Sequence, residues 1–323
     1  MEDIAGTRIC DLGLRIEGSP LEAPVARLYR ELERKGLGKF RPGCYLSDEW
    51  GCPSGEPVIG IPFYLADARL ARLEAERNDL ETPAEIMMYL RHEAGHAFNY
   101  AYRLHRTPEW RELFGPYRRP YRDHYRPVAF SREYVRHIAG WYAQKHPDED
   151  FAETFAVWLT PGSRWRQKYR WWGALRKLQY VARTARALRG KDPARARGRA
   201  DLTVDEMELT VEEFYARSRA EQAKLPEGAL MLDTDLADIF NVSPRRRRGA
   251  RPAVELLREH RKTVTDKVAY WTGAQRPLVK QLVDAMETRL QAGHLRADRA
   301  REGEHVAELS AYVAALAIHR LGR

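Results

Sequence analysis

The chain of 323 residues is poor in cysteine, and it has no long apolar run and no leader-like start. Its three cysteines, Cys10, Cys44 and Cys52, include no C-x-x-C pair, so we expect reduced thiols rather than disulfides. No stretch approaches the roughly 18 apolar residues of a membrane span. The first residues lack the basic and apolar regions of a signal peptide. These absences predict a cytoplasmic protein with no membrane partner.

Basic residues exceed acidic ones, with 55 Lys and Arg against 46 Asp and Glu and a formal net charge of +9. A basic surface can bind nucleic acid or another acidic partner. No nucleic-acid-binding motif accompanies the charge, and a run such as Arg245–Arg248 is typical of a solvated loop. We therefore expect an arginine-rich solvated surface rather than a nucleic-acid partner.

The stretch 82–104 carries the clearest functional signal. Thr82 can cap a helix here, and a glutamate three residues later can complete a capping box. On this predicted helix, His92 and His96 lie four residues apart and project from the same face. Two imidazoles at that spacing can fill two corners of a tetrahedral zinc site. Glu93 follows the first histidine, at the position of the general base in an H-E-x-x-H motif.

A third ligand must come from another part of the chain, because two histidines on a helix also occur without a metal. The metzincin pattern needs a histidine where this chain has Tyr102. A second predicted helix starts near Pro147, and on it Glu149 and Glu153 share a face. Glu149 can bind the metal while Glu153 supports a ligand from the second shell. Asp148 and Glu153 remain rival ligands.

Residues 58–65 are short, apolar and rich in β-formers, which predicts a strand. Pro62 cannot donate to a sheet and therefore favours a sheet edge. Such an edge can bind an extended peptide, and the candidate contacts are Gly60, Ile61 and Phe63. The alternative is a plain edge strand that packs on the helix.

The segment 110–127 alternates tyrosine with arginine. This pattern suits the recognition of carboxylates at the rim of a cleft, or stacking on nucleic-acid bases. We favour the cleft rim and name Tyr117, Arg118 and Arg119 as candidate substrate contacts. The alternative is an irregular connection that is partly buried.

The overall pattern is mainly helical with little strand, and 44% hydrophobic residues suffice for a sizeable core. This predicts an α+β fold with a small edge-stranded sheet and an active-site helix. We predict a catalytic domain at 1–188 and a linker at 189–204, because the latter stretch lacks apolar periodicity. The rest, 205–323, is predicted as a helical bundle with helices near 252–271, 275–293 and 303–321.

The motif HEAGH at 92–96, followed by HPDEDFAETFAVWL at 146–159, resembles the gluzincin metallopeptidases, and most closely the bacterial putative zinc-binding metallopeptidases. SDEWGCPSGEPVIGIPFYLA is also similar to theirs, so the resemblance covers roughly residues 40–185. A more distant likeness is to the catalytic domain of anthrax lethal factor, in which a tyrosine precedes the metal-binding glutamate by seven residues. Here Tyr142 stands seven positions before Glu149.

The resemblance implies a zincin-like fold, one zinc ion per chain and a peptide or protein substrate. It also implies that Glu93 acts as general base and that Tyr142 donates a hydrogen bond to the developing oxyanion. Two other functions remain open at this point. One is a zinc hydrolase of a non-standard amide, such as a modified or cell-wall peptide. The other is a basic nucleic-acid-binding protein with a structural zinc site. The sequence does not set the oligomeric state.

Overall fold

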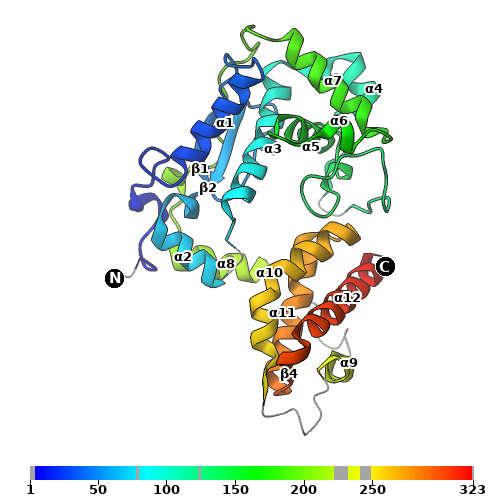
Figure 1. Ribbon diagram of the computed structural model, residues 1–323. Helices are drawn as coiled ribbons and strands as arrows, with labels where there is room; N and C mark the ends of the chain where they lie inside the picture. Colours follow the sequence, from blue (N-terminus) through cyan, green and yellow to red (C-terminus); the bar gives the residue numbers. More distant parts are fainter. Residues whose placement is uncertain (1–3, 78–79, 123–124, 222–231, 241–248, 322–323) are drawn as a thin grey trace. The chain divides into compact units, whose positions relative to one another are not determined.

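The computed structural model describes residues 4–77, 80–122, 125–221, 232–240 and 249–321. Two compact units make up the chain (Figure 1). The first contains Met1–Ile138 and Tyr142–Glu221, and the second contains Ala139–Trp141 and Gln222–Arg323. The fold is mainly helical with small two-stranded sheets, which confirms the predicted α+β class.

Helices dominate the first unit. Its α-helices are α1 (Glu22–Arg34), α2 (Ala68–Arg77), α3 (Pro83–Ala101), α4 (Pro108–Phe114), α5 (Pro147–Leu159), α6 (Trp165–Lys168), α7 (Ala174–Ala187) and α8 (Val211–Glu221). The 3-10 helices are η1 (Ile9–Leu12), η2 (Phe63–Ala66), η3 (Leu104–Arg106), η4 (Tyr142–Gln144) and η5 (Val204–Glu206). Strands β1 (Gly43–Ser47) and β2 (Val58–Pro62) form a parallel pair.

Helix α3 begins as its sequence predicts. The Thr82 hydroxyl accepts a hydrogen bond from the Glu85 N–H at 3.3 Å, and the Glu85 carboxylate accepts one from the Thr82 N–H at 2.8 Å. Pro83 occupies the first helical position, where its missing N–H has no cost. Every residue from Leu90 to Ala101 is buried. The ionisable residues of this stretch therefore need partners inside the protein.

One such partnership is a buried ion pair that joins α3 to α1. The Arg91 guanidinium donates to both carboxylate oxygens of Glu31, at 2.7 and 2.8 Å. The two side chains are only 8% and 3% exposed, and Glu31 has a second partner in Arg27 at 3.0 Å, so loss of Glu31 would leave the buried Arg91 charge without this carboxylate. Such a loss typically costs about 3–5 kcal/mol. The pair therefore holds α3, with its two histidines, against α1.

Helix α5 packs across α3 through aromatic side chains and is buried along its whole length. The rings of Phe98 and Phe155 stack with their centroids 4.9 Å apart, and Phe40 meets Phe98 edge-on at 5.3 Å. Helix α5 starts at Pro147, as predicted, and the Nδ1 atom of His146 caps it by accepting a hydrogen bond from a backbone N–H at 3.1 Å. A buried acidic helix start thus lies against a buried histidine-bearing helix.

Strand β2 is buried at all five positions and pairs with β1 so that Gly60 lies opposite Tyr45. Gly60 also exchanges backbone hydrogen bonds with Gly51, at 2.7 and 3.3 Å. The predicted free edge at Gly60 is therefore wrong, because a neighbouring loop residue already uses its N–H and C=O groups.

The second unit is helical, as predicted for this part of the chain. Its helices are α9 (Leu232–Ile239), α10 (Ala253–Thr272), α11 (Arg276–Ala292) and α12 (Glu302–Leu321), with a further 3-10 helix, η7 (Arg299–Arg301). Strands β3 (Ala250–Pro252) and β4 (Arg296–Asp298) pair antiparallel. Leucine and valine side chains from α10, α11 and α12 share one core. The run Arg245–Arg248 lies outside the described residues.

The structure corrects the predicted domain boundaries. Residues 189–204 are not a free linker, because the Arg195 N–H donates to the Ala101 carbonyl at 3.0 Å and the Tyr45 hydroxyl donates to Asp201 at 2.6 Å. The first unit then continues to Glu221. Polar and backbone contacts hold this stretch, so its lack of apolar periodicity did not indicate a boundary.

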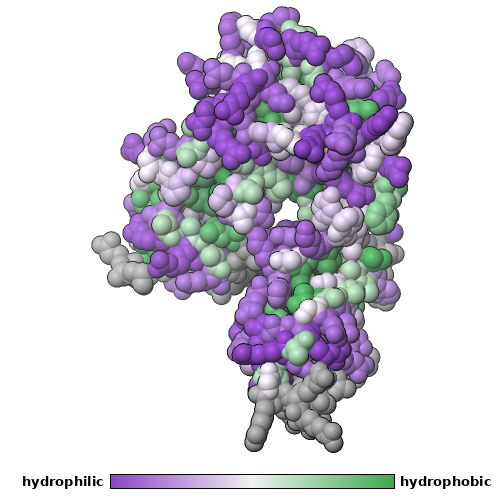
Figure 2. Space-filling model, viewed as in Figure 1, coloured by the Kyte–Doolittle hydropathy of each residue, from purple (hydrophilic) through white to green (hydrophobic). Residues whose placement is uncertain are grey.

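In the view of Figure 2, hydrophilic residues cover most of the coloured surface, as expected for a solvated arginine-rich exterior. None of the described helices combines the length and the apolar character that a bilayer crossing requires.

Candidate metal centre

The site depends on a close approach between α3 and α5. A Cβ atom built on Gly95 would lie 2.7 Å from the Cα atom of Ala152 and 2.9 Å from its carbonyl oxygen. Only glycine allows two backbones to meet this closely without a shift. Because Gly95 lies between His92 and His96, the approach sets both histidines against the first turns of α5.

Replacing Gly95 with alanine should separate the two helices and weaken metal binding. We expect the forced shift to lower stability by about 1–3 kcal/mol, the usual cost of overpacking a core. Gly303→Ala is the matched control, because Gly303 also lies in a helix and nothing stands within 4 Å of its built Cβ. There alanine should be neutral or stabilise by up to ~1 kcal/mol. Thermal unfolding and zinc titration of both variants would check this. Unchanged values for Gly95→Ala would contradict the role of the close approach.

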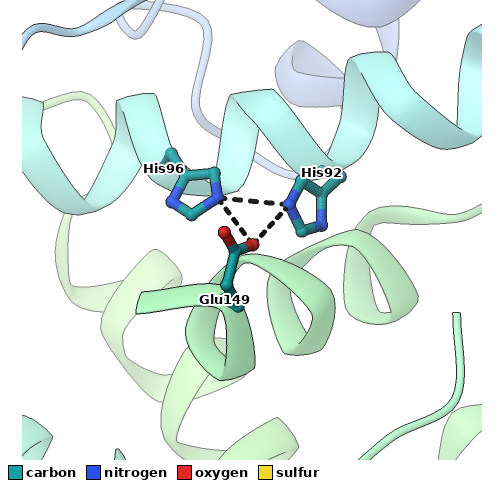
Figure 3. A group of neighbouring side chains, drawn as sticks. All are labelled: His92, His96 and Glu149. Carbon is teal, nitrogen blue, oxygen red and sulfur yellow. Dashed lines mark hydrogen bonds and ion pairs between the residues drawn. The ribbon is translucent and has the colours of Figure 1, made fainter. Parts of the chain in front are cut away.

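Three buried ligand atoms converge between the helices (Figure 3). The Oε2 atom of Glu149 lies 3.0 Å from His92 Nε2 and 3.2 Å from His96 Nε2, and the two Nε2 atoms are 3.1 Å apart. Ligand atoms at ~2.0–2.1 Å from a tetrahedral zinc ion stand roughly 3.4 Å from one another. Two imidazole nitrogens and one carboxylate oxygen at these separations therefore fit a zinc ion.

The other ring nitrogen of each histidine faces its own carboxylate. Nδ1 of His92 lies 2.8 Å from Glu153 Oε1, and Nδ1 of His96 lies 2.9 Å from Asp148 Oδ2. Carboxylates at Nδ1 fix the tautomer and direct each Nε2 toward the shared point. Among the three acidic candidates, the structure brings Glu149 to both Nε2 atoms, while Asp148 and Glu153 occupy supporting positions.

Asp148 is held in place by residues of α3. Its Oδ2 atom accepts a hydrogen bond from the Tyr100 hydroxyl at 2.5 Å, and its Oδ1 atom accepts one from the Asn99 side-chain amide at 2.7 Å. With His96 included, both oxygens of this buried carboxylate are satisfied. Asp148, predicted only as a rival ligand, thus contacts Nδ1 of His96 and supports that ligand.

The charges around the centre favour a cation. Burial opposes protonation of His92, but hydrogen bonds with Glu149 and Glu153 outweigh it and raise the pKa of His92 to about 10. The pKa of His96 is also raised, despite burial, by Asp148 and Glu149. Burial alone would raise the pKa of Glu149, yet the two histidines hold it well below its usual range. A site that stabilises positive charge this strongly suits a divalent metal.

Glu93 lies beside the ligands and is 6% exposed. Burial raises the pKa of its carboxyl group, while His92 and His96 oppose that shift. In the part of the chain that the structure describes, the Glu93 carboxylate makes no hydrogen bond to another residue. A buried carboxylate with a raised pKa and free lone pairs suits a general base.

Comparison with known proteins agrees with this geometry. Residues 55–163 match the family of putative zinc-binding metallo-peptidases. The matched segment contains His92, His96 and Glu149, which the site brings together, and also Glu93. No curated protein and no solved structure matches the chain.

Two tyrosines within the matched segment meet at the second oxygen of Glu149. The Tyr121 hydroxyl donates to Glu149 Oε1 at 2.5 Å, and the Tyr142 hydroxyl lies 3.3 Å from the same atom. Burial raises the pKa of both phenols, so both remain proton donors at neutral pH. The structure thus places Tyr142 at the centre. Tyr121 was not predicted, because it lies in an irregular segment with no periodicity to indicate its direction.

The arginine-tyrosine segment has two kinds of residue. The Tyr117 hydroxyl approaches the hydroxyls of Tyr100, at 3.4 Å, and Ser54, at 3.1 Å, so this side chain joins the polar network behind His96. Arg118 and Arg119 are exposed and stay candidate substrate contacts.

The predicted substrate contacts in β2 and at the start of η2 do not face solvent. Ile61 and Phe63 are 0% exposed and belong to the hydrophobic core of the first unit. Gly60 is buried, and its backbone is paired with Gly51. These three residues therefore support the site by packing, and we do not retain them as substrate contacts.

Proposed function

We propose that this chain is a zinc-dependent peptidase of the gluzincin type, with one zinc ion per chain. The observation that carries the proposal is the convergence of ligand atoms of His92, His96 and Glu149 within 3.0–3.2 Å. Beside them lies Glu93, whose carboxylate makes no hydrogen bond to any residue that the structure describes. Gluzincins take their third ligand, a glutamate, from a second helix, and Glu149 of α5 would play that part here. The substrate would be a peptide or protein.

The roles of the residues follow from their positions. When bound, zinc would act as a Lewis acid and lower the pKa of a water molecule towards ~7. Glu93 would accept the proton of the attacking water and later deliver it to the leaving amine. The Tyr142 hydroxyl would donate to the oxygen that becomes negative, an interaction typically worth about 3–4 kcal/mol.

The supporting carboxylates act through the histidines. Asp148 would orient His96, and Glu153 would orient His92, as their contacts with the two Nδ1 atoms suggest. Exposed Arg118 and Arg119 are our candidates for binding acidic groups or the carboxyl terminus of a substrate.

A structural zinc site is less consistent with this geometry. Structural zinc typically has four protein ligands, whereas catalytic zinc keeps one position open. Among the described residues, the metal-binding group contains three. That number favours a catalytic centre over the alternative of a nucleic-acid-binding protein with structural zinc. A zinc hydrolase of a modified amide would use the same centre and differs only in its substrate.

The test combines metal analysis with metal removal. We expect elemental analysis to find one zinc per chain in the wild type and none in His92→Ala. The zinc-loaded wild type should cleave members of a peptide library, lose that activity in a chelator, and regain it when zinc is restored.

Either of two results would overturn the proposal. Absence of zinc after reconstitution would remove the metal centre. Bound zinc without cleavage of any ordinary peptide would instead leave hydrolysis of a modified amide as the function to test.

A further inference from the structure

The two oxygens of the Glu149 carboxylate have different surroundings. Oε2 faces the histidine Nε2 atoms at 3.0 and 3.2 Å. Oε1 accepts hydrogen bonds from Tyr121 at 2.5 Å and Tyr142 at 3.3 Å. One oxygen is thus presented to the metal position, and the other is occupied by phenol groups.

We infer that Tyr121 is a positioning residue that restricts Glu149 to a single metal-binding oxygen. The inference rests on the proposed zinc centre. A carboxylate can bind a metal through one oxygen or through both. A short hydrogen bond to an ionised oxygen is among the strong ones, so a phenol at 2.5 Å competes effectively for Oε1. With Oε1 so held, Glu149 would supply one ligand atom, and with the two histidines and one water molecule it would complete a four-coordinate site, to which a second Glu149 oxygen would add a fifth ligand.

The two tyrosines would then have different roles. Tyr121 makes the shorter bond to Glu149, while Tyr142 makes a longer one and lies 3.3 Å from the Tyr121 hydroxyl. The longer bond is the more easily exchanged for a bond to substrate. Tyr121 therefore keeps Glu149 in place whenever Tyr142 turns to a developing oxyanion.

Tyr121 covers the carboxylate from the solvent side. The Tyr121 residue is 52% exposed, whereas Glu149 is 4% exposed. Although the residue is half-exposed, its hydroxyl reaches a buried candidate metal ligand. This contact is the basis for assigning Tyr121 a role in orienting the carboxylate.

The residues that begin α5 also hold Tyr121 in place. His146 caps the helix through Nδ1, while its Nε2 donates to the Arg119 carbonyl at 2.8 Å. The ammonium group of Lys145 lies 4.3 Å from the centroid of the Tyr121 ring, and the His146 ring lies 5.3 Å from it. The Lys145 cation lies over the Tyr121 ring, and the His146 imidazole links the start of α5 to the backbone at Arg119. Together these contacts hold Tyr121 beside the Glu149 carboxylate.

Tyr121→Phe tests the inference because it removes the hydroxyl and keeps the ring. The full-length protein would be stripped of metal and titrated with Co²⁺, whose visible absorption is strong in four-coordinate sites and weaker in five-coordinate ones. We expect the variant to show weaker bands, as Glu149 becomes bidentate, and a ~10–100-fold loss of metal affinity. Its kcat should fall more than its KM rises.

Tyr102→Phe is the matched control, because among the described residues the Tyr102 hydroxyl donates to the backbone carbonyl of Lys191 alone, at 3.0 Å. It should keep the wild-type spectrum and affinity. A Tyr121→Phe protein with both properties unchanged would overturn the inference. The Co²⁺ spectrum is measured without substrate, so it tests the role of Tyr121 independently of catalysis. The peptidase proposal would fail in a different experiment, if the metal-loaded wild type cleaved no peptide. A wild type that binds no Co²⁺ would overturn both.

Discussion

Glu93→Gln is expected to lower kcat/KM for peptide cleavage by about 10²–10⁴-fold while zinc stays bound. Glutamine has nearly the same shape as glutamate but cannot accept the proton of the attacking water. The Glu93 carboxylate is buried and makes no hydrogen bond to another described residue, so the substitution breaks no contact of the metal ligands. Elemental analysis and steady-state kinetics on a cleaved library peptide would measure the two quantities.

Glu112→Gln provides the control for the change in charge. Glu112 is 75% exposed on α4, and its nearest cation is a guanidinium nitrogen at 3.9 Å, so we expect wild-type kinetics and zinc content. An active Glu93→Gln enzyme would show that another group takes the proton. Loss of zinc together with activity would mean that Glu93 supports the centre instead of acting as its base.

The histidine pair could be predicted because both residues lie on one helix. A spacing of four residues fixes the relative direction of His92 and His96 whatever the rest of the chain does. The helix start was equally local, since Thr82 and Glu85 complete the capping box within a single turn. Features that depend only on neighbours in sequence were therefore accessible from the sequence.

The choice of third ligand depends on how two helices meet, and the sequence left three candidates. The early turns of α5 contain all three acidic candidates, Asp148, Glu149 and Glu153. In the structure each of them contacts at least one of the two histidines. Which oxygen reaches the Nε2 atoms depends on how α3 and α5 pack, and they meet closely at Gly95. No pattern within α5 carries that information.

Contacts of irregular segments were also beyond sequence analysis. The pairing of Gly51 with Gly60 removes a predicted sheet edge, although Pro62 pointed to one. The direction of Tyr121 depends on the bond between His146 and the Arg119 carbonyl, which joins residues far apart in the chain. Neither contact is accompanied by a periodic hydrophobic pattern in the sequence, so each is visible only in the structure.

Glu149→Gln is expected to abolish stoichiometric zinc binding, whereas Asp148→Asn and Glu153→Gln should weaken it by roughly 10–100-fold. Glu149 supplies the oxygen nearest both Nε2 atoms, and a neutral amide is a much poorer zinc ligand than a carboxylate. Asp148 and Glu153 act on the other ring nitrogens, so their amides would loosen the histidines without removing a ligand. Competition with a chromophoric chelator would measure all three affinities.

The order of the three affinities decides between the candidate ligands. Circular dichroism would show that each variant keeps its helices, and the amide substitutions keep the side-chain volume in these buried positions. Wild-type affinity in Glu149→Gln, with zinc lost from Asp148→Asn or Glu153→Gln, would move the ligand to the residue whose change removes the metal. Equal and modest losses in all three would mean that the histidines alone dominate binding. We expect zinc affinity to fall far more in Glu149→Gln than in the other two variants. The reason is that the Glu149 carboxylate faces the metal position, whereas those of Asp148 and Glu153 contact the other ring nitrogens of the histidines.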